Sequence, residues 1–201
     1  MVTFDQLPHD AQLVVLHELA QTATCHYALP ADVTTRLINL SENATYAVES
    51  PSSDLRFALR VHRAGYHGIP AIQSELNWLI NLRETGVVVT PRPLAGRDGT
   101  LVQQVAHPRL PAPRNVVLFD WETGAEPGID DDLEAPFETL GEVTARMHAH
   151  VRRWPRPANF TRFTWDFDTS LGETNPHWGR WRDGIGMDGA KGSGILGTAD
   201  G

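Results

Sequence analysis

A basic residue within an apolar strand and an acidic residue within a helix, 15 positions further on, constrain the fold of this chain most. Arg60 lies in segment 56–63, whose alternating apolar and polar residues are typical of a half-buried strand. Glu75 lies in segment 73–82, whose apolar residues follow helical spacing. If this strand and this helix pack together, the two side chains can form an ion pair. That pair is either an ordinary structural salt bridge or a device that positions bound phosphate.

The order of the surrounding elements predicts the fold class. Segments 35–40 and 45–50 are predicted strands that precede the Arg60 strand, with turns between them. The Glu75 helix follows, and segments 100–105 and 115–121 are predicted strands after a tight turn at 96–99. Three strands, one helix and two or three further strands indicate an α+β fold, in which an antiparallel sheet carries one packed helix.

Several motifs in this order resemble the aminoglycoside phosphotransferase and type II homoserine kinase-like family of small-molecule kinases, which have a protein-kinase-like fold. They lie at 41–46, 57–63, 72–79, 90–93, 118–124 and 140–148, and the resemblance covers residues 30–187. The resemblance implies a small lobe at residues 1–121, including an N-terminal helix between Pro8 and Thr24. Residues 122–187 are then expected to form the hinge and the first helices of an incomplete large lobe.

The last residues, 188–201, differ in composition from the rest of the chain. They are rich in Gly, lack periodicity and contain the only Lys of the chain, Lys191. We expect a disordered tail here. The abrupt change favours a truncated or frame-shifted gene product over a natural flexible tail, so that the family's large lobe is incomplete.

The resemblance also implies a site for ATP in the small lobe. Arg60 would contact the α- and β-phosphates in place of the more usual Lys, and Glu75 would orient it. The turn at 41–44 would offer backbone N–H groups to the phosphates. Val48 and Ala58 would wall the adenine. The expected nucleotide-binding residues are Ser41, Asn43, Ala44, Val48, Ala58, Arg60, Glu75, Phe119, Trp121 and Glu122.

Phosphoryl transfer further requires a residue that orients the acceptor hydroxyl and ligands for Mg²⁺. The family supplies them from a His-x-Asp-x-x-x-x-Asn loop and a following Asp motif, but no His of this sequence is followed two positions on by Asp. The segments 120–122 and 166–168 imitate the metal motif, and we interpret both as structural. We therefore expect no catalytic residue and no metal ligand in this chain, although an intact member would use Mg²⁺.

Three functions remain open. The leading hypothesis is an aminoglycoside phosphotransferase-like kinase that transfers phosphate from ATP to a small hydroxylated acceptor, inactive in this form. The alternatives are a non-catalytic nucleotide-binding or interaction module, and a chain without a function of its own. Fold alone does not decide between them.

Composition limits the partners and the location. The net charge of −8 and the pI near 5.5 argue against nucleic-acid binding. The sequence has no apolar run of about 20 residues, the length that spans a membrane, and no signal peptide. Cys25 is the single cysteine, so an internal disulfide is excluded. We expect a cytoplasmic protein whose partners are a nucleotide and a small molecule.

A second helix is predicted from an apolar stripe in the segment 137–154. The stripe is interpreted as core and consists of Phe137, Leu140, Val143, Met147, Val151 and Trp154. The acidic run at 130–132 precedes this helix and suits its positive N-terminal end. His148 and His150 lie two positions apart, so the helix directs them to different faces and they make a poor metal pair.

Overall fold

The structure is a computed structural model, and it describes residues 3–125, 127–128, 130–174 and 176. The described residues up to Phe160 form one compact unit, and those from Thr161 onward form a second one. The predicted tail at 188–201 lies outside the described residues, as does most of 175–187. No helix among the described residues combines the length and the apolar character that a membrane span requires.

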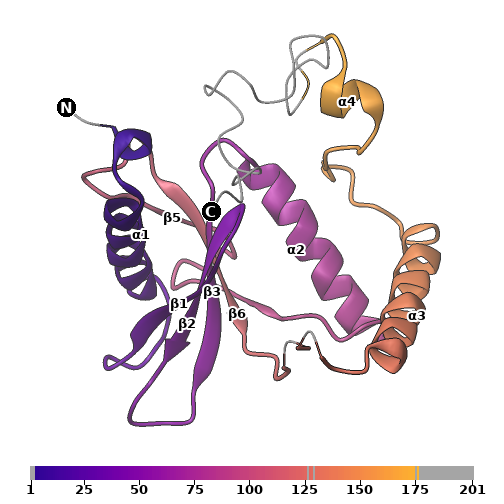
Figure 1. Ribbon diagram of the computed structural model, residues 1–201, viewed down its shortest axis with the longest axis horizontal. Coiled ribbons are helices and arrows are strands. Elements are labelled where there is room, and N and C mark those ends of the chain that lie inside the picture. The colour runs from indigo at the N-terminus through magenta and orange to yellow at the C-terminus, as the bar shows by residue number, and fades with distance from the viewer. Residues whose placement is uncertain (1–2, 126, 129, 175, 177–201) are drawn as a thin grey trace. The chain divides into compact units, whose positions relative to one another are not determined.

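The first unit is built on an antiparallel sheet (Figure 1). Its strand order is β1-β2-β3-β6-β4, and β5 also pairs with β6. The bounds are Thr34–Leu40 for β1, Asn43–Glu49 for β2, Arg56–His62 for β3, Pro93–Leu94 for β4, Gln103–Val105 for β5 and Arg114–Asp120 for β6. Every strand pair is antiparallel. This sheet and its helices confirm the predicted α+β class.

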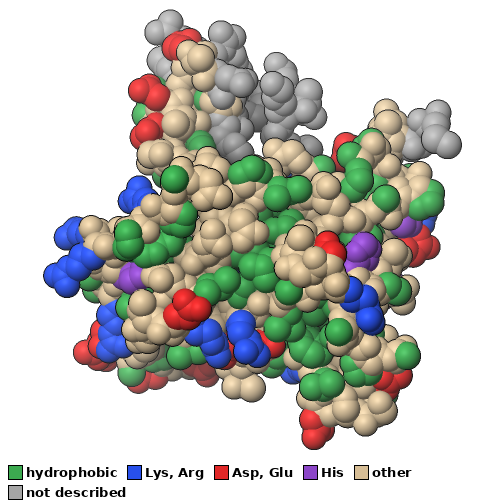
Figure 2. All heavy atoms as spheres, turned by 180° about the vertical axis from the view of Figure 1, so that it is seen from behind, with side chains coloured by type: hydrophobic (Ala, Val, Ile, Leu, Met, Phe, Trp, Pro, Cys, Tyr) green, Lys and Arg blue, Asp and Glu red, His purple; other side chains and the backbone are tan. Residues whose placement is uncertain are grey.

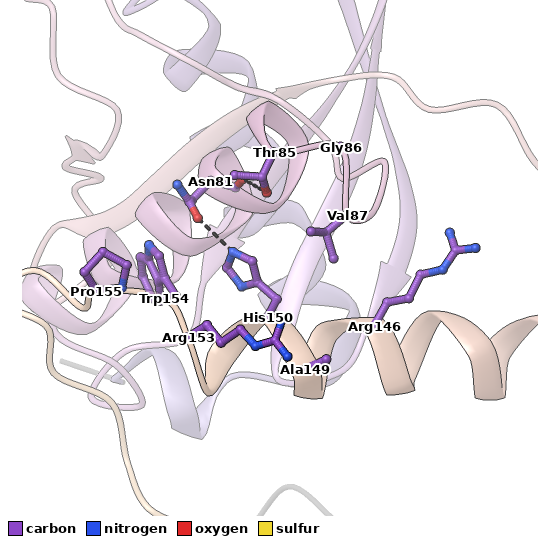
Figure 3. A pocket seen from close by; sticks show the side chains of 10 residues that line it. All are labelled: Asn81, Thr85, Gly86, Val87, Arg146, Ala149, His150, Arg153, Trp154 and Pro155. Atoms are coloured by element: carbon purple, nitrogen blue, oxygen red, sulfur yellow. Dashed lines mark hydrogen bonds between the residues drawn. The ribbon is translucent and has the colours of Figure 1, made fainter.

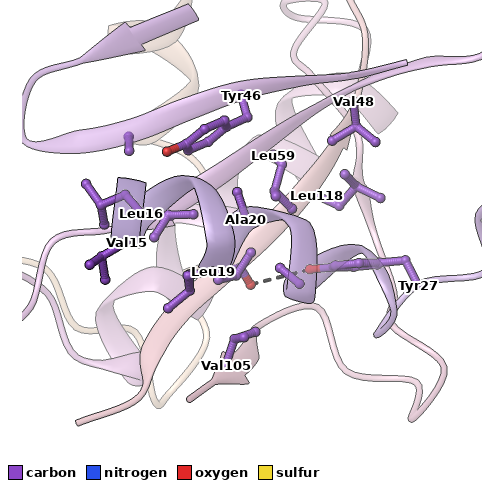
Figure 4. Close-up of a cluster of buried hydrophobic side chains, with 14 of the residues drawn as sticks. Val15, Leu16, Leu19, Ala20, Tyr27, Tyr46, Val48, Leu59, Val105 and Leu118 are labelled. Carbon is purple, nitrogen blue, oxygen red and sulfur yellow. Dashed lines mark hydrogen bonds between the residues drawn. The ribbon is translucent and has the colours of Figure 1, made fainter. Parts of the chain in front are cut away.

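Helix α1, His9–Thr24, covers one face of the sheet (Figures 1 and 4). A short 3₁₀ helix, Phe4–Gln6, precedes it. The buried residues of α1 recur at helical spacing and pack against side chains of β2, β3 and β6 in the larger hydrophobic cluster. The fully buried members that Figure 4 labels include Val15, Leu19, Tyr46, Val48, Leu59 and Leu118.

Helix α2, Ile69–Glu84, lies on the other side of the sheet (Figure 1). Gly68 precedes it and Pro70 occupies its first turn, where the missing N–H of proline costs no helical hydrogen bond. Ile72 and Leu76 of α2 bury themselves against Val117 and Phe119 of β6. This second cluster fixes the helix that carries Glu75 on the sheet.

Helix α3, Glu134–Val151, is amphipathic, but none of its residues is buried. Phe137 and Leu140 are 63% and 56% exposed. The prediction that the stripe forms a core is therefore wrong for its first half, where both side chains are exposed. As predicted, the acidic run meets the start of the helix, where Asp132 accepts a hydrogen bond from the Glu134 N–H at 3.1 Å.

The charges of α3 are distributed along its length. Glu134, Glu138 and Glu142 lie in its first half, and basic side chains follow from Arg146 onward. This order complements the helix dipole. Figure 2 shows basic side chains at the left edge of that view, on the side of α3. In the second unit, the short helix α4, Phe167–Leu171, begins at Asp166, which accepts the Thr169 N–H at 2.8 Å.

Candidate functional site

The predicted ion pair is present. Arg60 Nη1 of β3 lies 2.8 Å from Glu75 Oε1 of α2. Both side chains are partly buried, with 30% and 22% exposure. The guanidinium carbon also lies 5.0 Å from the ring centre of Phe119, on the neighbouring strand β6. Because a guanidinium has five N–H donors, the contact with Glu75 leaves others for an anionic ligand.

Strand alternation decides which of the predicted residues share the face of Arg60. Ala58 lies two positions before Arg60, so it points to the same side, and it packs with the α2 cluster. Val48 is fully buried in the α1 cluster. Val48 and Ala58 therefore point to opposite faces of the sheet and do not wall one pocket as predicted. The prediction was displaced by one position along β2, and successive side chains of a strand point to opposite faces of the sheet.

Ala47, and not Val48, is the β2 residue on the face of Ala58. It lies directly opposite Ala58 in the register of β2 and β3, and it is fully buried without belonging to either cluster. On the same face, Glu49 binds Arg56 Nε at 2.7 Å and Arg36 Nη2 at 3.6 Å. The register of β2 and β3 pairs Thr45 with Arg60 and Ala47 with Ala58, and the sequence pattern alone did not fix this register.

The predicted phosphate loop is the tight connection between β1 and β2, at residues 41–42. The Ser41 N–H donates to the Asn43 carbonyl at 3.1 Å, so this N–H is already used. Asn43 Oδ1 accepts the Arg63 N–H at 3.2 Å, which fastens the hairpin to the end of β3. Ala44 is buried in the α1 cluster. The three residues thus shape the hairpin, and their part in phosphate binding stays a prediction.

The predicted hinge residues are held by their neighbours. Phe119 is 3% exposed and belongs to the α2 cluster, next to Arg60. The guanidinium of Arg56 lies 3.5 Å from the ring centre of Trp121. Glu122 Oε1 binds Arg83 Nη1, near the end of α2, at 2.6 Å. The side chains of Trp121 and Glu122 are therefore held by β3 and by α2, respectively.

The two carboxylate pairs that imitate a metal motif have local partners. Asp120 Oδ2 lies 2.7 Å from Arg92 Nη2, and Glu122 is paired with Arg83. Asp166 caps α4. Within the described ranges, no three His, Cys, Asp or Glu side chains are grouped so that they could hold a metal ion.

The structure thus brings Ala58, Arg60, Glu75 and Phe119 together on the α2 side of the sheet. Trp121 and Glu122 follow at the end of β6, and Ser41 and Asn43 lie at the β1–β2 hairpin. This arrangement can hold an anion beside Arg60, on the face of β3 that Ala58 shares.

Solved structures share this fold. The chain matches a microcompartment-associated aminopropanol kinase with 45% sequence identity and a TM-score of 0.71, over 83% of this chain and 50% of that one. It matches amicoumacin kinase hAmiN, in a complex with AMP-PNP, Ca²⁺ and Ami, with 18% identity and a TM-score of 0.60, over 79% of this chain and 47% of that one. These neighbours confirm the predicted kinase-like fold.

The chain spans about half the length of these two solved structures. A comparison with curated proteins gave no match. The phosphotransferase enzyme family (APH) matches residues 34–183, a range that contains the sheet, α2 and α3. The chain therefore belongs to the phosphotransferase enzyme family.

Proposed function

We propose that this chain carries the nucleotide-binding part of an ATP-dependent small-molecule kinase. The observation that supports the proposal is the ion pair of Arg60 and Glu75, 2.8 Å long, beside Ala58 and Phe119. Arg60 binds the α- and β-phosphates of ATP, and Glu75 holds the guanidinium toward them. The adenine lies near Ala58 and the hinge backbone at residues 119–122. Ala47 replaces Val48 as the partner of Ala58 in this proposal.

The residues of this chain suit the nucleotide better than the metal. Phosphoryl transfer requires Mg²⁺ on the phosphates, which neutralises their charge. The described residues offer no cluster of metal-binding side chains, and the sequence has no His followed two positions on by Asp. We therefore assign nucleotide binding to these residues and no step of the transfer reaction.

The acceptor of the complete enzyme is a small hydroxylated molecule in this proposal. Its first candidate is an amino alcohol, because the 45% identical neighbour is an aminopropanol kinase. ATP and a small acceptor are the partners, and a cytoplasmic location, where ATP is abundant, is part of the proposal.

A calorimetric titration with ATP tests nucleotide binding. We expect the parent chain to bind weakly, Arg60→Ala to abolish the binding heat, and Glu75→Ala to weaken binding less, because Arg60 loses only its orientation. Arg109→Ala is the matched control, since it breaks an ion pair of the same 2.8 Å length with Glu18, on α1. If Arg60→Ala bound ATP as well as the parent and the control did, the proposed site would be wrong.

A second candidate function is a non-catalytic nucleotide-binding module. The observation that favours it is the assembled pair of Arg60 and Glu75 in a chain without the acceptor-orienting loop. The DNA that follows the Met187 codon discriminates the two. A His-x-Asp-x-x-x-x-Asn loop encoded there in another frame would support the kinase, and its absence would support the module.

A further inference from the structure

The structure contains an open pocket between the ends of α2 and α3, with a volume of about 650 Å³ (Figure 3). It is lined by Asn81 of α2 and by Thr85, the residue after that helix. Arg146 and His150 of α3 line it as well, followed by Arg153 and Trp154. Figure 3 shows the His150 ring pointing from α3 toward Asn81. His150 is half-buried, and the proposed function does not use it.

Both nitrogens of the His150 ring contact α2. Nε2 lies 2.8 Å from Asn81 Oδ1, and Nδ1 lies 3.3 Å from Trp78 Nε1. An indole N–H can only donate, so Nδ1 must accept and therefore carries no proton. The proton of the neutral ring is then on Nε2, where it is donated to Asn81. The two contacts together are satisfied only by the neutral form of His150.

These contacts reach the helix that carries Glu75. Glu75, Trp78 and Asn81 follow one another at intervals of three residues along α2, so they share a stripe of the helix surface. Because α2 is one continuous helix from Ile69 to Glu84, holding its second half also holds Glu75. Glu75 in turn binds Arg60 at 2.8 Å.

We propose that His150 is a positioning residue for the nucleotide site: its neutral ring holds α2 through Trp78 and Asn81 and thereby sets the Glu75–Arg60 pair. The inference rests on the proposed function for its effect on nucleotide affinity. The contact between α3 and α2 stands by itself.

Protonation of the His150 ring would break its contact with Trp78. A proton on Nδ1 would face the Trp78 N–H, so two donors would oppose each other. The charged side chains that line the pocket are Arg146 and Arg153, and Arg146 is paired with Glu142. The two side chains of α2 that contact the ring, Trp78 and Asn81, are uncharged. Trp154 also stacks on the ring, with the two ring centres 6.0 Å apart. A proton on Nδ1 would therefore remove the acceptor that the Trp78 N–H uses.

The first measurement follows the indole N–H resonance of Trp78 by NMR in the full chain, without nucleotide, between pH 8 and pH 5.5. Trp78→Phe identifies the resonance. We expect it to shift with pH in the parent and in His148→Gln, and to stay constant in His150→Gln. His148 is the matched control because it is an exposed His two positions away on the same helix. Gln at position 150 can still donate to Asn81 and does not titrate.

The second measurement is ATP affinity by calorimetry over the same pH range. Between pH 8 and pH 5.5 we expect the ATP affinity of the parent to fall by about fivefold more than that of His150→Gln. A factor of about five corresponds to the loss of one neutral hydrogen bond. The His150→Gln variant retains the pH dependence that ATP itself brings. His150→Ala should bind about fivefold more weakly than the parent at pH 8, and Gln at this position should restore most of the loss.

The outcomes separate the two proposals. A Trp78 resonance that does not respond to pH in the parent, or responds equally in His150→Gln, would overturn the contact. Equal pH dependence of ATP affinity in the parent and in His150→Gln would overturn the positioning role. If no chain bound ATP at any pH, the proposed function and the positioning role would both fall, while the NMR titration alone would still decide the contact.

Discussion

Val48 and Ala58 lie on adjacent strands, and their side chains point to opposite faces of the same sheet. Val48 packs under α1 in the larger cluster. Ala58 packs on the side of α2, two positions before Arg60. One face of this sheet therefore stabilises the fold, and the other face presents the candidate site.

A substitution at Val48 should change stability, and a substitution at Ala58 should change ATP affinity. Val48→Ala removes two buried methyl groups and should lower the free energy of unfolding by about 2 kcal/mol, with ATP affinity unchanged. Ala58→Val adds volume on the site face and should weaken ATP binding roughly tenfold, with stability within about 1 kcal/mol. Urea unfolding and calorimetry measure the two quantities. The face assignment would fail if Val48→Ala weakened ATP binding more than Ala58→Val did.

Removal of the hydroxyl group should change the free energy of unfolding in opposite directions at two buried tyrosines. The Tyr46 hydroxyl is buried and has no hydrogen-bond partner among the described residues, and burial raises its pKa to about 12. Tyr27 donates its hydroxyl to the Val116 carbonyl at 3.4 Å. Tyr46→Phe should therefore raise the free energy of unfolding by about 1 kcal/mol, and Tyr27→Phe should lower it by about 1 kcal/mol. Urea unfolding of both variants checks this, and a destabilised Tyr46→Phe would contradict it.

The pairing of α1 with the loop after β5 predicts an acid effect on stability. A hydrogen bond from Arg109 to Glu18 lowers the pKa of the Glu18 carboxyl, and His107 adds to this against partial desolvation. Because the folded-state pKa lies below the unfolded value of 4.5, the contribution is present above pH 4.5 and is lost as the pH falls through the folded-state pKa.

Glu18→Gln should therefore flatten the decline of the urea midpoint between pH 6 and pH 3. The control is Glu138→Gln, which removes an exposed carboxylate of α3 that forms no ion pair in the described part of the chain. The explanation would be wrong if both variants retained the full slope of the parent.

The exposed half of the α3 stripe predicts self-association. At about 25 cal/mol per Å² of apolar area, a few hundred uncovered Å² correspond to several kcal/mol of lost burial, which is comparable to the stability of a domain. The purified chain should associate and bind a hydrophobic dye. Replacing Phe137 and Leu140 with Gln should reduce both without lowering the melting temperature, because these side chains are 63% and 56% exposed. A monomeric elution profile and a sharp cooperative melt of the parent would argue against this.

Turnover requires a residue that orients the acceptor hydroxyl. The 201-residue chain should transfer no phosphate from radiolabelled ATP to amino alcohols, homoserine or aminoglycosides, because its sequence has no His-x-Asp-x-x-x-x-Asn loop to orient the acceptor. Any labelled product should be the same for the parent and for Arg60→Ala. Steady turnover that Arg60→Ala abolishes would show that the chain carries a catalytic residue that we did not identify.

The sequence by itself predicted the class of fold, the order of the elements and the pair of Arg60 and Glu75. These follow from local patterns, since alternation marks a strand and helical spacing marks a helix. The pair is separated by 15 positions, which join one strand to one helix. The motifs in these elements resemble small-molecule kinases, and the match of the phosphotransferase enzyme family to residues 34–183 confirms this resemblance.

Only the tertiary structure decided which side chains share a face. A shift of one residue in strand register reverses every side chain, so the sequence pattern alone placed Val48 where Ala47 lies. The stripe of α3 looked like core because periodicity shows that a helix has an apolar face but not what covers it. His150 joined Trp78 and Asn81 through contacts 72 and 69 positions apart, a separation at which no local pattern predicts a contact.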